Sequence, residues 1–124
     1  MNYEANIPIW LQVMNLIKAD IVTGKRAPGD KLPGGRDLAL SYSINPNTAA
    51  RVYRELEDEG LCETRRGMGT YVTEDKARIS KLRADMADEA VRDFINKIQE
   101  LGISYEEVTQ ILDKEAKECW KANK

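Results

Sequence analysis

A group of short polar and cationic side chains opens one predicted helix and has the chemistry to bind a nucleic acid. Asn45 precedes a proline, and this pair is a strong start signal, because asparagine is among the best N-caps and proline suits the first helical position. Asn47 and Thr48 fill the first turn, where free backbone N–H groups and the helix dipole attract phosphate. Asparagine can also pair with adenine, and Arg51 and Arg54 give the helix a cationic edge. Many proteins start a helix this way without binding DNA, so this turn alone leaves a structural role open.

A second group of this kind surrounds a predicted hairpin tip. Arg65 and Arg66 precede Gly67 and Gly69, and Thr70 follows. Glycines permit close approach of the backbone, and the arginines can lie along phosphate or enter a narrow minor groove. A basic tip is also common in turns that bind nothing. The two glycines do not indicate a nucleotide site, because no helix follows them.

Positive charge is concentrated locally, although the chain is acidic overall. The 19 basic and 21 acidic residues give a formal net charge of −2. Arg36 begins another predicted helix, and Lys25, Arg26 and Lys31 precede it. Binding to DNA releases counterions through local contacts, so the acidic total does not exclude it.

The elements that must position these residues have a recognisable order. Apolar spacing and turn residues predict helices over 7–24, 35–42 and 45–60, followed by strands over 61–66 and 70–73 around a turn at Gly67-Met68-Gly69. This is the order of a winged helix-turn-helix, in which the third helix enters the major groove. The predicted core positions are Trp10, Leu11, Met14, Ile17, Ile21, Leu38, Ala39, Ala49, Val52, Tyr53 and Leu56.

The rest of the chain predicts two helices. A long amphipathic helix covers about 74–101 and ends at Gly102, and Ser104 and Glu107 form a capping box for a second helix over 105–121. We therefore expect a DNA-binding domain over residues 1–76 and a helical dimerisation segment over residues 77–124. Such a hairpin is too small to enclose a deep core, so it packs on the first domain or, as we expect, on a second copy. The predicted dimerisation residues are Leu82, Met86, Ala90, Phe94, Ile98, Leu101, Val108, Ile111 and Leu112.

The composition argues against several classes of protein. The chain has 124 residues, 42% hydrophobic and 32% charged, which is typical of one globular domain or a small domain with an appendage. Histidine is absent, and Cys62 and Cys119 form no CxxC pattern, so we expect no metal, no cofactor and no enzyme activity. No long apolar stretch or signal peptide is visible, so we expect no membrane association and a cytoplasmic location.

Five segments, in a characteristic order and spacing, resemble the GntR family of bacterial transcriptional regulators. They are PIWLQ at 8–12, LPGGRDLA at 32–39, INPNT at 44–48, YRELEDEGL at 53–61 and TRRGMGTYV at 64–72. The Asn-Pro-Asn-Thr form and the short two-helix tail are most similar to the YtrA-type subfamily. The resemblance implies a dimeric repressor of a two-fold symmetric operator, and YtrA-type members often regulate transporter operons. By position it implies that the DNA contacts include Arg36, Asn45, Asn47, Thr48 and Arg51 in the helix-turn-helix and Arg65, Arg66, Gly67 and Gly69 in the wing.

Two departures from the family pattern concern the DNA-binding elements. Gly34 and Gly35 replace the usual serine and its neighbour, so the second helix lacks a side-chain cap and a serine hydroxyl for phosphate. Met68 replaces the basic residue common at the wing tip, which would weaken the hold of the wing on DNA. With 48 residues after Lys76 and no histidine, we expect no enclosed effector pocket and no metal site in the tail. A small effector bound at the dimer interface stays open, and the sequence does not identify one.

The sequence thus predicts a mainly α protein, a winged helix-turn-helix with a C-terminal two-helix hairpin, that regulates transcription by binding double-stranded DNA as a homodimer. A winged-helix module that binds proteins and not DNA is the alternative, and the acidic total charge suits it. A small enzyme is a weaker alternative, because no pair of acids and no lysine stands at a convincing spacing for catalysis.

Overall fold

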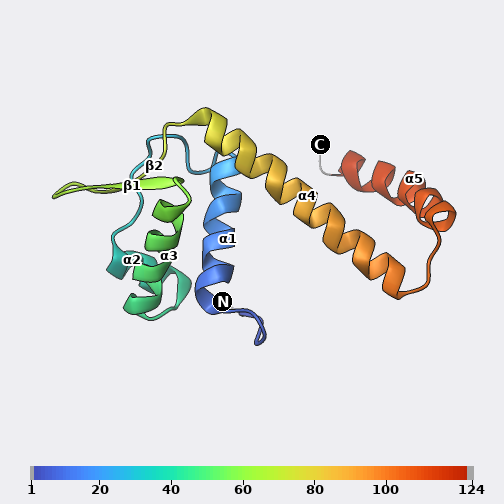
Figure 1. Ribbon diagram of the computed structural model, residues 1–124, viewed down its shortest axis with the longest axis horizontal. Helices are drawn as coiled ribbons and strands as arrows, with labels where there is room; N and C mark the ends of the chain where they lie inside the picture. The colour runs from blue at the N-terminus through green and yellow to red at the C-terminus, as the bar shows by residue number, and fades with distance from the viewer. Residues whose placement is uncertain (1, 123–124) are drawn as a thin grey trace. The chain divides into compact units, whose positions relative to one another are not determined.

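The computed structural model describes residues 2–122, which form five helices and one antiparallel hairpin (Figure 1). The elements are α1 (Ile9–Val22), α2 (Gly35–Tyr42), α3 (Pro46–Asp58), β1 (Cys62–Arg65), β2 (Gly69–Val72), α4 (Lys76–Glu100) and α5 (Tyr105–Ala122). This order confirms the predicted fold class. The chain forms two compact units, one ending at Ala84 and the other beginning at Asp85.

Apolar side chains from the three short helices and the hairpin form the core of the first unit. Val13, which we did not predict, is buried with the rest of the α1 stripe, whereas Trp10 and Leu11 are only partly buried. The first turns of α4 also belong here, since Ile79 and Leu82 pack against this core. The buried residues are Val13, Met14, Ile17, Ile21, Leu32, Leu38, Ala39, Ala49, Val52, Leu56, Leu61, Cys62 and Val72.

Local signals fix both ends of α3. The Asn45 side chain accepts a hydrogen bond from the backbone N–H of Asn47 at 2.7 Å, and Pro46 is the first helical residue. Gly60 has a φ of +73°, which suits glycine after the end of a helix. The buried face of α3 carries Ala49 and Val52, which leaves the opposite face to solvent.

The hairpin differs from the predicted one by one residue at its turn. Gly69, which we placed in the turn, is the first residue of β2 and pairs with Arg65, so the loop consists of Arg66, Gly67 and Met68. The segment before α2 runs beside β2, where Leu32 N–H donates to the Thr70 carbonyl at 2.8 Å. Together with the bond from the Val72 N–H to the Asp30 carbonyl at 2.8 Å, this attaches the second strand of the hairpin to the core.

In the second unit, the rest of α4 and α5 form a helical hairpin. Gly102, with a φ of +70°, follows α4, and the Ser104 hydroxyl oxygen accepts a hydrogen bond from the backbone N–H of Glu107 at 3.2 Å. The predicted N-terminal cap of α5 is therefore present. No helix within residues 2–122 combines the length and apolarity needed to cross a bilayer.

Candidate nucleic-acid interface

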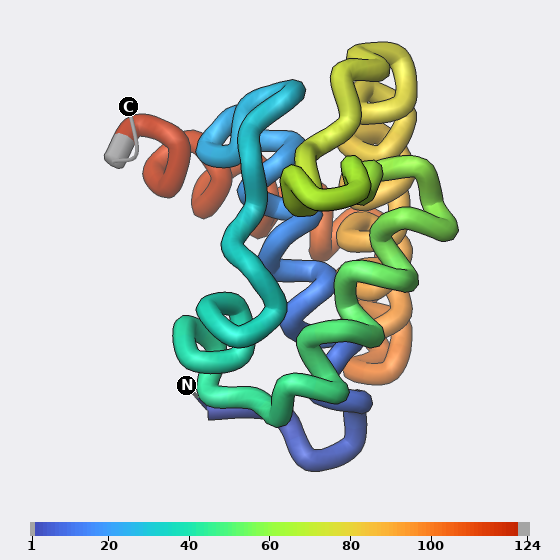
Figure 2. Tube along the Cα trace, turned by 90° about the vertical axis from the view of Figure 1, so that its left-hand side faces the viewer, coloured from blue at the N-terminus to red at the C-terminus, as the bar shows by residue number. Residues whose placement is uncertain are grey.

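The elements predicted to bind DNA lie on one side of the first unit. In Figure 1, α2, α3 and the hairpin lie to the left of α1, and Figure 2 shows the same three elements in front of α1. The start of α3 and the tip of the hairpin are therefore accessible from one side. This is the arrangement that a winged helix-turn-helix needs to contact a single duplex.

The first turn of α3 exposes two asparagines. Asn45 and Asn47 are exposed, and Thr48 is partly buried. Because the side-chain oxygen Oδ1 of Asn45 caps the helix, this residue has a structural role whatever it binds. Asn47 keeps its whole side chain available for a ligand, and only its backbone N–H is used by the cap.

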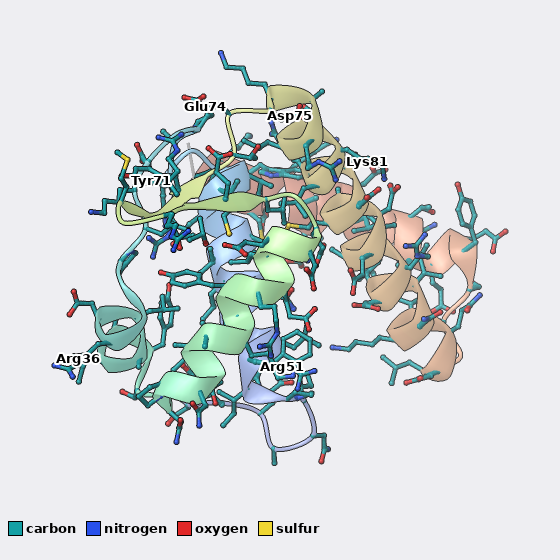
Figure 3. All side chains as sticks on the ribbon, turned by 60° about the vertical axis from the view of Figure 1, so that its left-hand side comes forward. Arg36, Arg51, Tyr71, Glu74, Asp75 and Lys81 are labelled. Carbon is teal, nitrogen blue, oxygen red and sulfur yellow. The ribbon has the colours of Figure 1, made fainter. Side chains whose placement is uncertain are left out.

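Three of the predicted DNA-contacting arginines are exposed without an acidic neighbour. No carboxylate in the described part of the chain lies within 4.0 Å of Arg36, Arg54 or Arg66. Figure 3 shows Arg36 at the outer edge of α2. Since α2, α3 and the hairpin each supply one of the three, each element carries a cation that can contact phosphate.

Arg51, in contrast, is held by its own chain. Its guanidinium carbon lies 4.3 Å from the centroid of the Trp10 ring, and its Nε lies 3.7 Å from a carboxylate oxygen of Glu55. Arg51 is labelled beside the start of α1 in Figure 3. The sequence did not identify Trp10 as a partner, because 41 residues separate it from Arg51.

Arg65 is held in a similar way on the hairpin. Glu63 accepts hydrogen bonds from its Nη2 at 2.8 Å and its Nε at 3.1 Å, and the Tyr71 ring centroid lies 4.2 Å from its guanidinium carbon. These hydrogen bonds with Glu63 raise the pKa of Arg65. Glu63 and Tyr71 are directly opposite each other in the hairpin register. Phosphate must therefore compete with Glu63 for this arginine.

The remaining predicted wing residues have different surroundings. Gly67 has a φ of +75°, and apart from its two chain neighbours no described residue has an atom within 4 Å of the position a Cβ would take. Thr70 is partly buried, with its hydroxyl oxygen 3.3 Å from that of Thr64. Met68 is 58% exposed at the tip. The tip of the hairpin is thus exposed to solvent, whereas Thr70 is partly covered.

Gly69 is required by the backbone, so Gly69→Ala should lower the free energy of unfolding by about 1–3 kcal/mol. Its φ of +117° lies beyond the left-handed helical region, and a Cβ there would be 2.9 Å from the Lys31 Cε. Urea denaturation followed by circular dichroism measures the change. Gly67→Ala is the matched control, with a smaller expected loss; equal losses would contradict this account.

The N-cap of α2 is a glycine in place of the serine that is usual in the family. Gly34 is the N-cap of α2 and gives it no side-chain hydrogen bond, as the sequence predicted.

Burial raises the pKa of the Cys62 thiol to about 12, so this group is not a nucleophile at neutral pH. Within residues 2–122, no group of acids and cysteines is placed to hold a metal ion.

The predicted dimerisation residues divide between the two units. Leu82 packs against the core of the first unit, so its side chain already has a partner within the chain. In the second unit, Leu101 is 72% exposed, Met86 is half-buried and Ala90 and Ile111 are exposed. An apolar groove of about 450 Å³ lies between α4 and α5, and four predicted residues line it: Phe94, Ile98, Val108 and Leu112.

Comparison with known proteins gives the family. The model of the bacterial regulatory proteins of the gntR family matches residues 10–72. The HTH-type transcriptional repressor YtrA of Bacillus subtilis is 36% identical over 106 residues, which cover 85% of this chain and 82% of YtrA.

Solved structures agree with this match. A GntR family transcriptional regulator from Listeria monocytogenes is 39% identical with a TM-score of 0.82, over 90% of this chain and 98% of that one. The DNA-binding domain of AraR, solved in complex with operator ORX1, is 25% identical with a TM-score of 0.53, over 59% of this chain and 90% of that one. The chain therefore belongs to the gntR family of bacterial regulatory proteins and is a transcriptional regulator of the YtrA type, not an enzyme.

Proposed function

We propose that this regulator is a repressor that binds a palindromic operator as a homodimer. One observation carries the proposal: the start of α3 and the hairpin tip are exposed on one side of the first unit, and α2, α3 and the hairpin each carry an arginine that forms no ion pair with any described residue. The repressor activity of YtrA and the operator complex of AraR support it. A regulator of this kind acts where the chromosome lies, which in bacteria is the cytoplasm.

Each residue of the interface has a proposed role. Asn47 reads base edges in the major groove, where an asparagine pairs with adenine, and Arg51 contacts phosphate or guanine at the flank of α3. Arg36, Arg54 and Arg66 bind phosphates and position the protein. Asn45 and Thr48 complete the first turn of α3, and the wing residues Arg65, Gly67, Gly69 and Thr70 follow the neighbouring backbone or minor groove.

In the proposed dimer, the helical hairpin of α4 and α5 forms the two-fold symmetric contact between the two copies. Its apolar groove and exposed apolar side chains need a partner, and a second copy offers the same surfaces. A two-fold dimer presents two copies of α3, so the operator should contain half-sites about one helical turn, roughly 34–36 Å, apart or a multiple of that. A transporter operon is the proposed target, and no small-molecule effector is assigned.

The test is selection of binding sites from a pool of random DNA duplexes. The proposal expects an enriched inverted repeat whose affinity falls steeply with salt, because bound phosphates release counterions. The enriched repeat should also occur upstream of a transporter operon in the source genome. Failure to enrich any duplex, together with a flat response of DNA binding to salt, would overturn the proposal and favour the protein-binding alternative.

Arg51→Ala should weaken binding to the selected duplex by at least about 1 kcal/mol at fixed salt. Loss of the guanidinium removes a contact at the flank of α3 without altering the buried face of the helix. Fluorescence anisotropy with a labelled duplex measures the change. Arg92→Ala removes the same charge from the second unit and should leave affinity unchanged; equal affinities for all three proteins would exclude Arg51 from the interface.

A further inference from the structure

We propose that Trp10, which lies on α1 outside the helix-turn-helix, is a positioning residue for DNA recognition and acts through Arg51. This inference rests on the proposed function, since it concerns how one of the proposed DNA contacts is oriented. It is carried by the contact of the Arg51 guanidinium with the Trp10 ring, 4.3 Å from the ring centroid.

The position of the Trp10 ring is set by helix packing. Trp10 is partly buried and packs against the core of the first unit, next to the buried stripe of α1. A second contact joins α1 to the C-cap residue of α3, where Lys18 Nζ lies 3.0 Å from a carboxylate oxygen of Glu59. The two contacts are eight residues apart in both segments, so α1 and α3 run side by side in the same direction. The start of α1 is thereby held against the start of α3.

Stacking suits an arginine that must also form hydrogen bonds. A guanidinium attracted to an aromatic face keeps the N–H donors at its edge, which can bind a guanine or a phosphate in a bidentate way. The Glu55 carboxylate, 3.7 Å from the Arg51 Nε, adds a weaker restraint from the next turn of α3. Together the ring and the carboxylate limit the orientations of this side chain before DNA binds.

Arg54 provides an internal comparison, because it lies on the same helix as Arg51 but has no ring or carboxylate that restrains it among the described residues. A free arginine loses much of its rotational freedom when it binds, whereas a held arginine has already lost part of it. Trp10 should therefore strengthen the contribution of Arg51 and leave that of Arg54 unchanged.

The test is a double-mutant cycle measured by anisotropy on the duplex selected by the unmodified protein. Trp10→Leu should weaken binding about fivefold in the natural background and have no further effect in the Arg51→Ala background. In an Arg54→Ala background it should again weaken binding about fivefold. Trp10→Phe, which keeps an aromatic ring, should restore most of the affinity.

Two controls separate positioning from general damage to the fold. Thermal unfolding identifies any loss of stability in Trp10→Leu, which would weaken binding equally in every background. Lys18→Gln breaks the other contact between α1 and α3 and should not change affinity. An equal effect of Trp10→Leu with and without Arg51, or tighter binding by Trp10→Leu, would overturn the inference alone. Failure of the unmodified protein to bind any duplex would overturn the proposed function as well.

Discussion

Phe94→Asp should convert the proposed dimer to a monomer at micromolar concentration. Phe94 is partly exposed and lines the apolar groove between α4 and α5, which we propose is covered by a second copy. A carboxylate in that position would lose its hydration in the dimer without gaining a partner, and an unpaired buried charge costs several kcal/mol. Sedimentation equilibrium measures the mass directly.

Loss of the dimer should also reduce affinity for the operator. Two linked DNA-binding units gain roughly 10²- to 10⁴-fold over one, because the second binds at a high effective concentration. The variant should therefore bind the two half-sites of the operator independently and about a hundredfold more weakly. A duplex with a single half-site should be bound equally by the variant and by the natural protein's monomer.

Arg92→Asp is the matched control for this experiment. It introduces the same side chain two positions away, at an exposed site that is not part of the groove lining. It should remain dimeric and retain helical circular dichroism. If Phe94→Asp also remains dimeric while keeping its helical signal, the second copy binds to another surface.

The sequence predicted the helices of the first unit well because their signals are local. The bounds of α2 agree to the residue, and α3 begins where Asn45 and its proline indicated. The predicted turn of the hairpin lies one residue later in the chain than the observed loop. The reason is that two glycines with positive φ flank Met68, and either one can belong to a turn. The pairing of Arg65 with Gly69 decides between them, and such pairing depends on the opposite strand.

The state of the site arginines could not be read from the sequence in the same way. Arg51 and Arg54 look equivalent in the chain, but the packing of α1 against α3 puts Trp10 beside Arg51 only. Likewise, no ion pair or ring contact within residues 2–122 involves Arg66, whereas Arg65 is held by Glu63 and the Tyr71 ring. Residue type predicted which side chains carry positive charge. Contacts in the folded chain determine which arginine must first be released from a carboxylate and which is already oriented by a ring.

Leu82 shows the same limit for the helical segment. The apolar stripe continues without interruption from Ile79 through the rest of α4, so the sequence gives no reason to divide it. In the structure, Ile79 and Leu82 pack against the core of the first unit, whereas the stripe beyond Ala84 belongs to the second. The apolar stripe of α4 therefore packs on the core of the first unit at its start and belongs to the helical hairpin of the second unit beyond Ala84.

Arg54→Glu should weaken operator binding more than removal of the Arg54 side chain alone, because it replaces a cation in the proposed interface with an anion. Arg54 is exposed on α3, opposite the buried Val52 and Leu56, and no described carboxylate neutralises it. Removing a phosphate or base contact from arginine costs about 1–3 kcal/mol, and the new carboxylate adds repulsion from the DNA backbone. Binding to the selected duplex should weaken at least about fiftyfold, and the slope of log affinity against log salt should decrease by about 1 to 2.

Salt titration distinguishes this electrostatic effect from a local loss of structure. A misfolded helix would also weaken binding, but α3 is held by its buried face and its Asn45 cap, neither of which involves Arg54. Circular dichroism of Arg54→Glu should therefore match that of the natural protein. Arg92→Glu gives the same change in net charge on the second unit and should leave both affinity and salt slope almost unchanged, because the field of a distant exposed charge is screened within about 8 Å at physiological salt. Equal losses in the two variants would mean that net charge, and not a contact made by α3, governs the binding of DNA.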